Sequence, residues 1–222
     1  MLVKVCGATT AEEVRAVAGA GADLVGLWHG VPGGHADLSA GRLAALAAEA
    51  RTTGRLRSVL VTFGSDPSAL ARTATAVGTD WIQLHGYQPP AVVRALRAEL
   101  PGRTRVVKVL HVRDGACPEA GLIGAYERAG TDLFLLDAVT TDGRVGSTGH
   151  TLDDRTVTAL ADRTTRSFLL AGGLRHANRD RFGATLAHPG FLGIDVDSAV
   201  RGDAGLLDGA RTADLVHAWK AS

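Results

Sequence analysis

The 222-residue chain has few of the residues that define disulfide-rich, metal-stapled or membrane proteins. It contains two cysteines, Cys6 and Cys117, which lie far apart and without the spacing of metal ligands. No uninterrupted apolar run reaches the length of a membrane span, and the first residues lack the pattern of a secretory signal. We therefore expect a cytoplasmic protein with no disulfide framework, no metal site and no membrane contact.

Lysine is scarce as well, and the formal net charge at pH 7 is only +1. Without a block of Lys and Arg there is no electrostatic footprint for a nucleic acid, so any anion that binds is expected to be small. Hydrophobic residues make up 45% of the chain, which is enough for a sizeable core. No linker or change of composition divides the chain, so we expect a single domain over residues 1–222 that binds a small molecule.

Eight short apolar runs alternate with Ala-, Arg- and Glu-rich segments of helical periodicity, which is typical of βαβ units around a parallel sheet. This count favours a closed (β/α)8 TIM barrel, and an open doubly wound sheet is the alternative because periodicity does not show closure. Thr10, Asp66-Pro67 and Pro89-Pro90 indicate helix starts. The expected strands are Leu2 to Cys6, Asp23 to Trp28, Ser58 to Phe63, Trp81 to His85, Arg105 to Val112, Leu133 to Asp137, Ser167 to Ala171 and Leu192 to Val196.

Two of these strands end in groups that exchange protons, namely the thiol of Cys6 and the carboxyl group of Asp137. All strands of such a barrel end at one rim, where its active sites lie, so the two groups are predicted to share a pocket. Gln83 and His85 end the fourth strand at the same rim and are expected to bind substrate or to be satisfied within the barrel. Taken alone, a strand-end Cys can be a small buried hydrophobe and an Asp can cap a turn.

Glycine-bearing segments follow the sixth, seventh and eighth strands. Glycine lets backbone N–H groups approach an anion, and a short helix beginning near Ser198 would add its N-terminal dipole. Such a cup can bind a phosphate group without a lysine, although the same residues can simply make a turn and a helix cap. A carboxylate beside a phosphate must point away or be compensated, which concerns Asp197. The predicted phosphate-binding residues are Gly149, Gly172, Gly173, Asp197, Ser198 and Ala199.

Seven short stretches of the chain carry a family resemblance. They are V-K-V-C-G-A-T-T at 3–10, G-A-D-L-V-G-L at 21–27, Q-L-H-G at 83–86, L-L-D-A at 135–138, G-S-T-G-H-T at 146–151, L-A-G-G-L at 170–174 and G-I-D-V-D-S-A-V at 193–200. In these stretches, which follow the order of the family and span almost the whole chain, the chain resembles the phosphoribosylanthranilate isomerase family of tryptophan biosynthesis. The resemblance implies a TIM barrel that performs an Amadori rearrangement, with Cys6 as general base, Asp137 as general acid and no cofactor.

In that chemistry a protonated acid opens the furanose ring to a Schiff base, and a thiolate then removes the C2 proton to give an enolamine. The pKa of the Cys6 thiol must then be lowered, and Lys4, two residues earlier on the same barrel face, is expected to assist and to lie in the substrate site. Asp137 must keep its proton, which a partly desolvated pocket favours.

The loop after the second strand departs from the family, which usually carries a Ser-Pro-Arg segment whose arginine engages the anthranilate carboxylate. The arginine position becomes Ala36, or His35 if one gap is allowed, and neither offers a guanidinium fork. One hypothesis is a tryptophan-pathway isomerase that recognises its substrate through His29, His35 or Arg42.

Two further hypotheses stay open. One is a divergent isomerase or lyase that acts on another phosphorylated sugar-like compound. The other is a non-catalytic phosphometabolite-binding barrel, for which the presence of both Cys6 and Asp137 gives no reason. Long loops at 30–37 and 139–151 are expected to cover the substrate, and the sequence leaves monomer and homodimer open.

Overall fold

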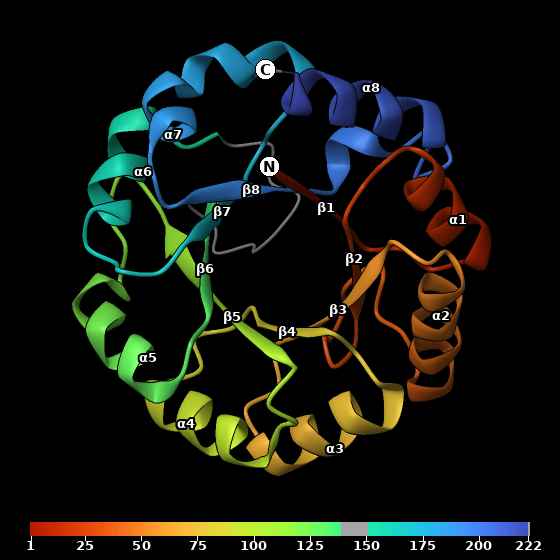
Figure 1. Ribbon diagram of the computed structural model, residues 1–222, viewed down its shortest axis with the longest axis horizontal. Helices are drawn as coiled ribbons and strands as arrows, with labels where there is room; N and C mark the ends of the chain where they lie inside the picture. The colour runs from red at the N-terminus through yellow and green to blue at the C-terminus, as the bar shows by residue number, and fades with distance from the viewer. Residues whose placement is uncertain (139–150, 222) are drawn as a thin grey trace.

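A computed structural model describes residues 1–138 and 151–221 of the chain. Eight parallel strands form a closed barrel in chain order, and helices surround it as an outer ring (Figure 1). Closure confirms the predicted (β/α)8 barrel and excludes the open sheet. The strands are β1 (Leu2–Cys6), β2 (Leu24–Trp28), β3 (Arg57–Thr62), β4 (Trp81–Leu84), β5 (Arg105–Val112), β6 (Leu133–Ala138), β7 (Phe168–Leu170) and β8 (Phe191–Val196).

Three of the described helices, the first, third and fourth, begin at the predicted helix starts. Thr10 caps the first helix, where its hydroxyl accepts from the N–H of Glu13 while Glu13 accepts from the N–H of Thr10. Asp66 caps the third with Pro67 in its first turn. The helices are α1 (Ala11–Gly19), α2 (Ala40–Thr52), α3 (Pro67–Val77), α4 (Pro90–Glu99), α5 (Ile123–Ala129), α6 (Asp154–Ala161), α7 (Gly183–Ala187) and α8 (Gly209–Lys220), with 3-10 turns η1 (Ala120–Leu122), η2 (His176–Phe182) and η3 (Ser198–Val200).

Strand alternation divides each strand between two apolar layers. On β1, Val3 and Val5 belong to the cluster that packs between the barrel and the helices, whereas Cys6 belongs to the cluster inside the barrel. Lys4, which has the same parity as Cys6, is buried beside it. The alternation therefore points the side chains of Lys4 and Cys6 into the barrel. Cys6, the last residue of β1, lies at the carboxyl end of the strand.

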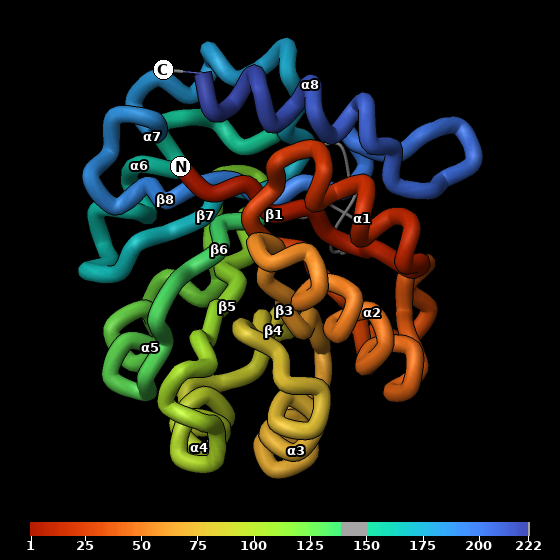
Figure 2. Tube along the Cα trace, turned by 45° about the vertical axis from the view of Figure 1, so that its right-hand side comes forward, coloured from red at the N-terminus to blue at the C-terminus, as the bar shows by residue number. Residues whose placement is uncertain are grey.

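The barrel closes where β8 meets β1, which joins the two ends of the chain. Leu2 pairs with Gly193 and Lys4 pairs with Asp195 in parallel register. A Cβ at Gly193 would overlap the backbone carbonyl of Leu2, so only glycine lets the two strands approach this closely. Helices α1 and α8 lie side by side along this seam (Figure 2).

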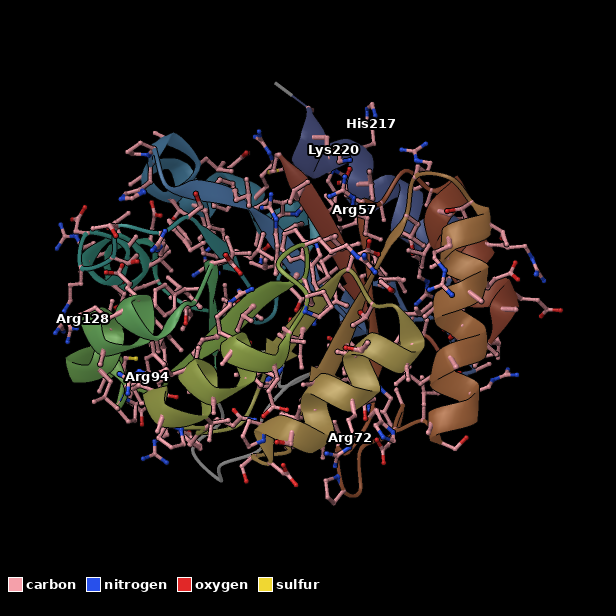
Figure 3. All side chains as sticks on the ribbon, turned by 60° about the horizontal axis from the view of Figure 1, so that its bottom comes forward. Arg57, Arg72, Arg94, Arg128, His217 and Lys220 are labelled. Carbon is pink, nitrogen blue, oxygen red and sulfur yellow. The ribbon has the colours of Figure 1, made fainter. Side chains whose placement is uncertain are left out.

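The amino ends of the strands carry basic side chains at the opposite end of the barrel. Lys220 pairs with Asp23 at 2.7 Å, and the backbone N–H of Arg57 donates to the carbonyl of Asp23. Figure 3 shows Arg57, His217 and Lys220 on this part of the surface. Within the described residues, no helix is both long enough and apolar enough to span a bilayer.

Replacement of Gly193 by alanine is expected to lower the free energy of unfolding by about 1 to 3 kcal/mol, because the added methyl group forces β8 away from β1. Urea unfolding followed by circular dichroism measures the change. The control is Gly41→Ala, at an exposed position of α2 where a Cβ meets no atom within 4 Å. It should raise stability by up to about 1 kcal/mol. Equal stability of the two variants would contradict the close approach at the seam.

Candidate active site

A pocket lies at the rim where the strands end, and it gathers residues from both halves of the chain. Cys6 comes from β1 and Asp137 from β6, which lie on different sides of the barrel (Figure 1). The predicted meeting of a thiol and a carboxyl group in one pocket is thus present in the structure. The lining residues are Cys6, Trp28, His85, Asp137, Ala171, Gly172, Gly173, Leu174, Asp195, Val196, Asp197, Ser198 and Ala199.

The sulfur of Cys6 accepts two hydrogen bonds. Lys4 Nζ and Trp28 Nε1 each donate to Sγ at 3.1 Å. Gly26 on the neighbouring strand leaves room for this cluster, since a Cβ there would lie 2.5 Å from Sγ and 3.1 Å from Lys4 Nζ. Two donors aimed at one sulfur favour its thiolate form, because an anion is the better acceptor.

Burial nevertheless raises the pKa of Cys6 to about 12. The positive charge of Lys4 lowers the pKa, but the negative charges of Asp195 and Asp197 raise it further. The sequence-based expectation of a lowered pKa was therefore wrong, although the expected contact with Lys4 is present. The reason is that the sequence reveals the neighbouring charge but not the loss of solvent around the sulfur.

Lys4 is held by Asp195, with 2.7 Å between Nζ and Oδ2, and both side chains are buried. Burial acts to lower the pKa of Lys4, but Asp195 and Cys6 together raise it above its ordinary value. Burial raises the pKa of Asp195 to about 6, against the lowering effect of Lys4. Lys4 is thus an ammonium group at neutral pH and contacts the thiol and the carboxylate together. It does not itself line the pocket.

The sequence analysis missed Asp195. The residue lies within the stretch G-I-D-V-D-S-A-V at 193–200, two residues before the predicted Asp197. Residues two apart on a strand share one face, and this alternation could have placed Asp195 on the inner face of the barrel. Its pairing with Lys4 depends on the register across the seam, which the sequence does not contain.

Asp137 faces His85 across the barrel, with 3.4 Å between Oδ2 and Nε2. Gln83 Nε2 lies 2.9 Å from His85 Nδ1, and His111 Nε2 lies 2.9 Å from the carbonyl oxygen of His85. Burial lowers the pKa of His85 against the opposing effect of Asp137, so the imidazole is neutral near pH 7. Gln83 is fully buried and does not line the pocket, so it orients His85 and does not reach the substrate space.

Those residues predicted to bind phosphate that the structure describes lie together in the lining of this pocket. Gly172 and Gly173 have φ angles of 90° and 58°, and the 3-10 turn η3 begins at Ser198 beside them in the pocket. Asp197 is compensated as the sequence analysis required, because Arg201 Nε lies 2.6 Å from its Oδ1. Gly149 and nearly all of the loop at 139–151 fall outside the described residues.

Of the three candidate residues that follow β2, one lies next to residues that line the pocket. His35 packs edge-on against Trp28, with ring centroids 4.7 Å apart, and its Nε2 lies 3.6 Å from Asp197 Oδ2. His29 Nδ1 instead contacts the carbonyl oxygen of Leu38, and Arg42 Nε donates to the carbonyl of Thr9. The remaining candidate for the family's arginine position, Ala36, is buried.

A closed (β/α)8 barrel with a thiol and a carboxyl group in one pocket at its rim has the groups that an aldose–ketose isomerase working by proton transfer requires. The family model for N-(5'phosphoribosyl)anthranilate (PRA) isomerase matches residues 3–218, and this chain belongs to that family. The N-(5'-phosphoribosyl)anthranilate isomerase of Afipia carboxidovorans is 34% identical over 219 residues, which cover 99% of this chain and 87% of that protein.

Solved structures agree in fold. TrpF from Jonesia denitrificans superposes with a TM-score of 0.74 and 29% identity, covering 99% of this chain and 97% of that one. A monomeric form of the dimeric phosphoribosylanthranilate isomerase from Thermotoga maritima gives a TM-score of 0.78 at 23% identity, covering 99% and 98% of the two chains. At that identity the second likeness supports the fold alone.

Alkylation should report the high pKa of the buried thiol. In a Cys117→Ser background, the rate of Cys6 modification by iodoacetamide is expected to rise about tenfold per pH unit from pH 7 to 10, because the thiolate fraction does so below a pKa of about 12. Lys4→Met should slow the reaction at every pH, because it removes the ammonium group that lowers the pKa of the Cys6 thiol. Lys220→Met, at the far end of the barrel, is the matched control and should have no effect. A rate plateau near pH 8.5 would contradict the assignment.

Proposed function

We propose that this chain catalyses the Amadori rearrangement of N-(5'-phosphoribosyl)anthranilate, an isomerisation of an aldose amine to a ketose amine. The observation that carries the proposal is that the Cys6 thiol and the Asp137 carboxyl group line one pocket beside the Gly172-Gly173 cup. Membership of the isomerase family supports it. A barrel that only binds a phosphometabolite needs neither proton-exchanging group.

In this proposal Asp137 is the general acid. It donates its proton to the ring oxygen of the ribose, the bond from C1 to that oxygen breaks, and the nitrogen lone pair forms the Schiff base. The neutral imidazole of His85, 3.4 Å from Oδ2, fixes the orientation of the carboxyl group. Gln83 acts one step further away, through His85 Nδ1.

Cys6 is the general base in the same proposal. Its sulfur takes the proton from C2, the electron pair left behind forms the C1–C2 double bond, and the π electrons of the C1–nitrogen bond return to the nitrogen to give the enolamine. A thiol pKa near 12 leaves little thiolate in the resting protein, so the base depends on nearby positive charge. Lys4 supplies one charge, and the protonated Schiff base beside C2 supplies another once the ring has opened.

The remaining pocket residues would hold the two ends of the substrate. Backbone groups at Gly172, Gly173, Ser198 and Ala199 are assigned to the phosphate group because of the positive φ angles of the two glycines and the adjacent 3-10 turn. Gly149, which lies outside the described residues, is assigned to it from the sequence alone. Asp197 lines the same pocket, and its ion pair with Arg201 compensates its negative charge beside the proposed phosphate position.

The aromatic end of the substrate would lie against Trp28 and His35. Trp28 lines the pocket, and His35 packs against its ring on the loop after β2. His35 Nε2 offers a hydrogen-bond donor for the anthranilate carboxylate where the family usually has arginine. The proposed setting for this activity is the cytoplasm, with the chain acting as a monomer or a homodimer on a small phosphorylated substrate.

Complementation of a tryptophan auxotroph that lacks the isomerase tests the proposal. The unaltered chain is expected to restore growth, and Cys6→Ala and Asp137→Asn should abolish it by lowering kcat/KM about 10²- to 10⁴-fold, as loss of general acid–base catalysis does. Isomerase assays on the purified variants measure the loss. Cys117→Ala, which removes the other thiol, is the matched control and should grow normally. Soluble, folded protein that never supports growth would refute the activity.

A bound anion should mark the phosphate cup. Crystals soaked in phosphate are expected to hold the anion among Gly172, Gly173 and Ser198, and Gly173→Ala should raise KM more than it lowers kcat. Gly205→Ala is the control, because Gly205 also has a positive φ angle but lies outside the pocket. An anion found only elsewhere would overturn the assignment of the cup.

A further inference from the structure

One carboxylate oxygen in the pocket has no use in the mechanism above. Asp195 Oδ2 holds Lys4, but Asp195 Oδ1 is buried and makes no hydrogen bond to any residue that the structure describes. The only other buried atom of a pocket-lining residue without a hydrogen bond in the described chain is His85 Nε2, which lies 3.4 Å from Asp137. Buried polar atoms are rarely left unpaired in proteins, so Oδ1 calls for a partner that occupies the pocket.

The position of Asp195 identifies that partner. One ammonium group, Lys4 Nζ, lies 3.1 Å from Cys6 Sγ and 2.7 Å from Asp195 Oδ2, so the thiol and the carboxylate flank the same point. The substrate atom that meets Cys6 in the proposed function is the hydrogen on C2. The hydroxyl group on that same carbon is a donor next to it, and a carboxylate oxygen only accepts.

We propose that Asp195 is a catalytic residue whose Oδ1 accepts a hydrogen bond from the C2 hydroxyl group of the substrate and takes its proton when the enolamine becomes the ketone. This inference rests on the proposed function, since it concerns the last step of the same rearrangement.

The protons balance over the cycle. Asp137 gives one proton to the ring oxygen, and Cys6 takes one from C2. In the step assigned here, the O–H bond at C2 breaks, its electrons form the C2 carbonyl, and the former double bond takes the proton of the Cys6 thiol at C1. Asp195 ends with one extra proton and Asp137 lacks one, and exchange with water resets both.

The charges around Asp195 suit this task. The groups that face it are Lys4 and Cys6 on β1, Asp137 across the barrel, and Asp197 at the end of its own strand. Burial raises the pKa of Asp195 to about 6 while Lys4 opposes the rise, so the group is ionised at pH 7 yet is a stronger base than an exposed carboxylate. Protonation of Asp195 below about pH 6 would remove the hydrogen-bond acceptor, so activity is expected to fall as the pH drops below 6.

Isotope effects in Asp195→Asn test the assignment. The amide keeps the size of the side chain but cannot take the proton, so kcat for N-(5'-phosphoribosyl)anthranilate is expected to fall about 10²-fold or more, with a smaller change in KM. Because the step after C2 deprotonation becomes limiting, the Cys6 thiol has time to exchange its hydrogen with solvent, so deuterium at C2 should lose its effect on kcat while the D₂O effect grows. The matched control is Asp23→Asn, which affects a carboxylate at the opposite end of the barrel and should leave the kinetics unchanged.

The alternative is that Asp195 only positions Lys4 and Cys6. C2 deprotonation would then become slower, so a C2 deuterium effect that is retained or increased in Asp195→Asn would overturn the inference, as would unchanged kcat. If Asp195→Asn does not fold, Lys4→Met/Asp195→Asn avoids the unpaired ammonium, and its D₂O effect should exceed that of Lys4→Met alone. An equal effect would overturn the inference. Absence of turnover by the unaltered protein would instead refute the proposed function, and the assignment of Asp195 with it.

Discussion

The buried ion pair between Lys4 and Asp195 joins the first strand of the barrel to the last. It bridges β1 and β8 at the seam where the two ends of the chain meet, and it also contacts the sulfur of Cys6. Removal of one partner from such a pair typically costs about 3 to 5 kcal/mol, because the other charge is left without solvent or a counter-ion. The side chains that bridge the barrel seam are therefore the same ones that set the electrostatics around the Cys6 thiol.

Glycine makes that contact geometrically possible. Gly193 lets β8 approach the backbone of β1, and Gly26 leaves room on β2 for the sulfur and the ammonium group. A side chain at either position would push the interacting groups of Lys4, Cys6 and Asp195 apart. Gly172 and Gly173 act differently, because their positive φ angles shape the backbone of the cup and do not relieve a close approach.

Much of the site follows from local pattern. A (β/α)8 barrel puts all strand ends at one rim, so the terminal residues of β1 and β6, Cys6 and Asp137, were predicted to meet once eight alternating units were counted. The requirement that Asp197 be compensated also follows from its chemistry, and Arg201 meets it. What the local pattern did not predict was the pKa of Cys6, which depends on how completely surrounding atoms exclude water.

The sequence by itself determined the barrel, the helix starts, the membership of the isomerase family and the rim positions of Cys6 and Asp137, because these depend on periodicity, capping chemistry and short motifs. Only the tertiary structure decided the register that pairs Lys4 with Asp195 and the burial that raises the thiol pKa. It also decided that His35 contacts the pocket-lining Trp28, whereas His29 and Arg42 contact backbone carbonyl groups. The physical reason is that register, burial and contact link residues far apart in the chain, whereas periodicity and capping act within a few residues.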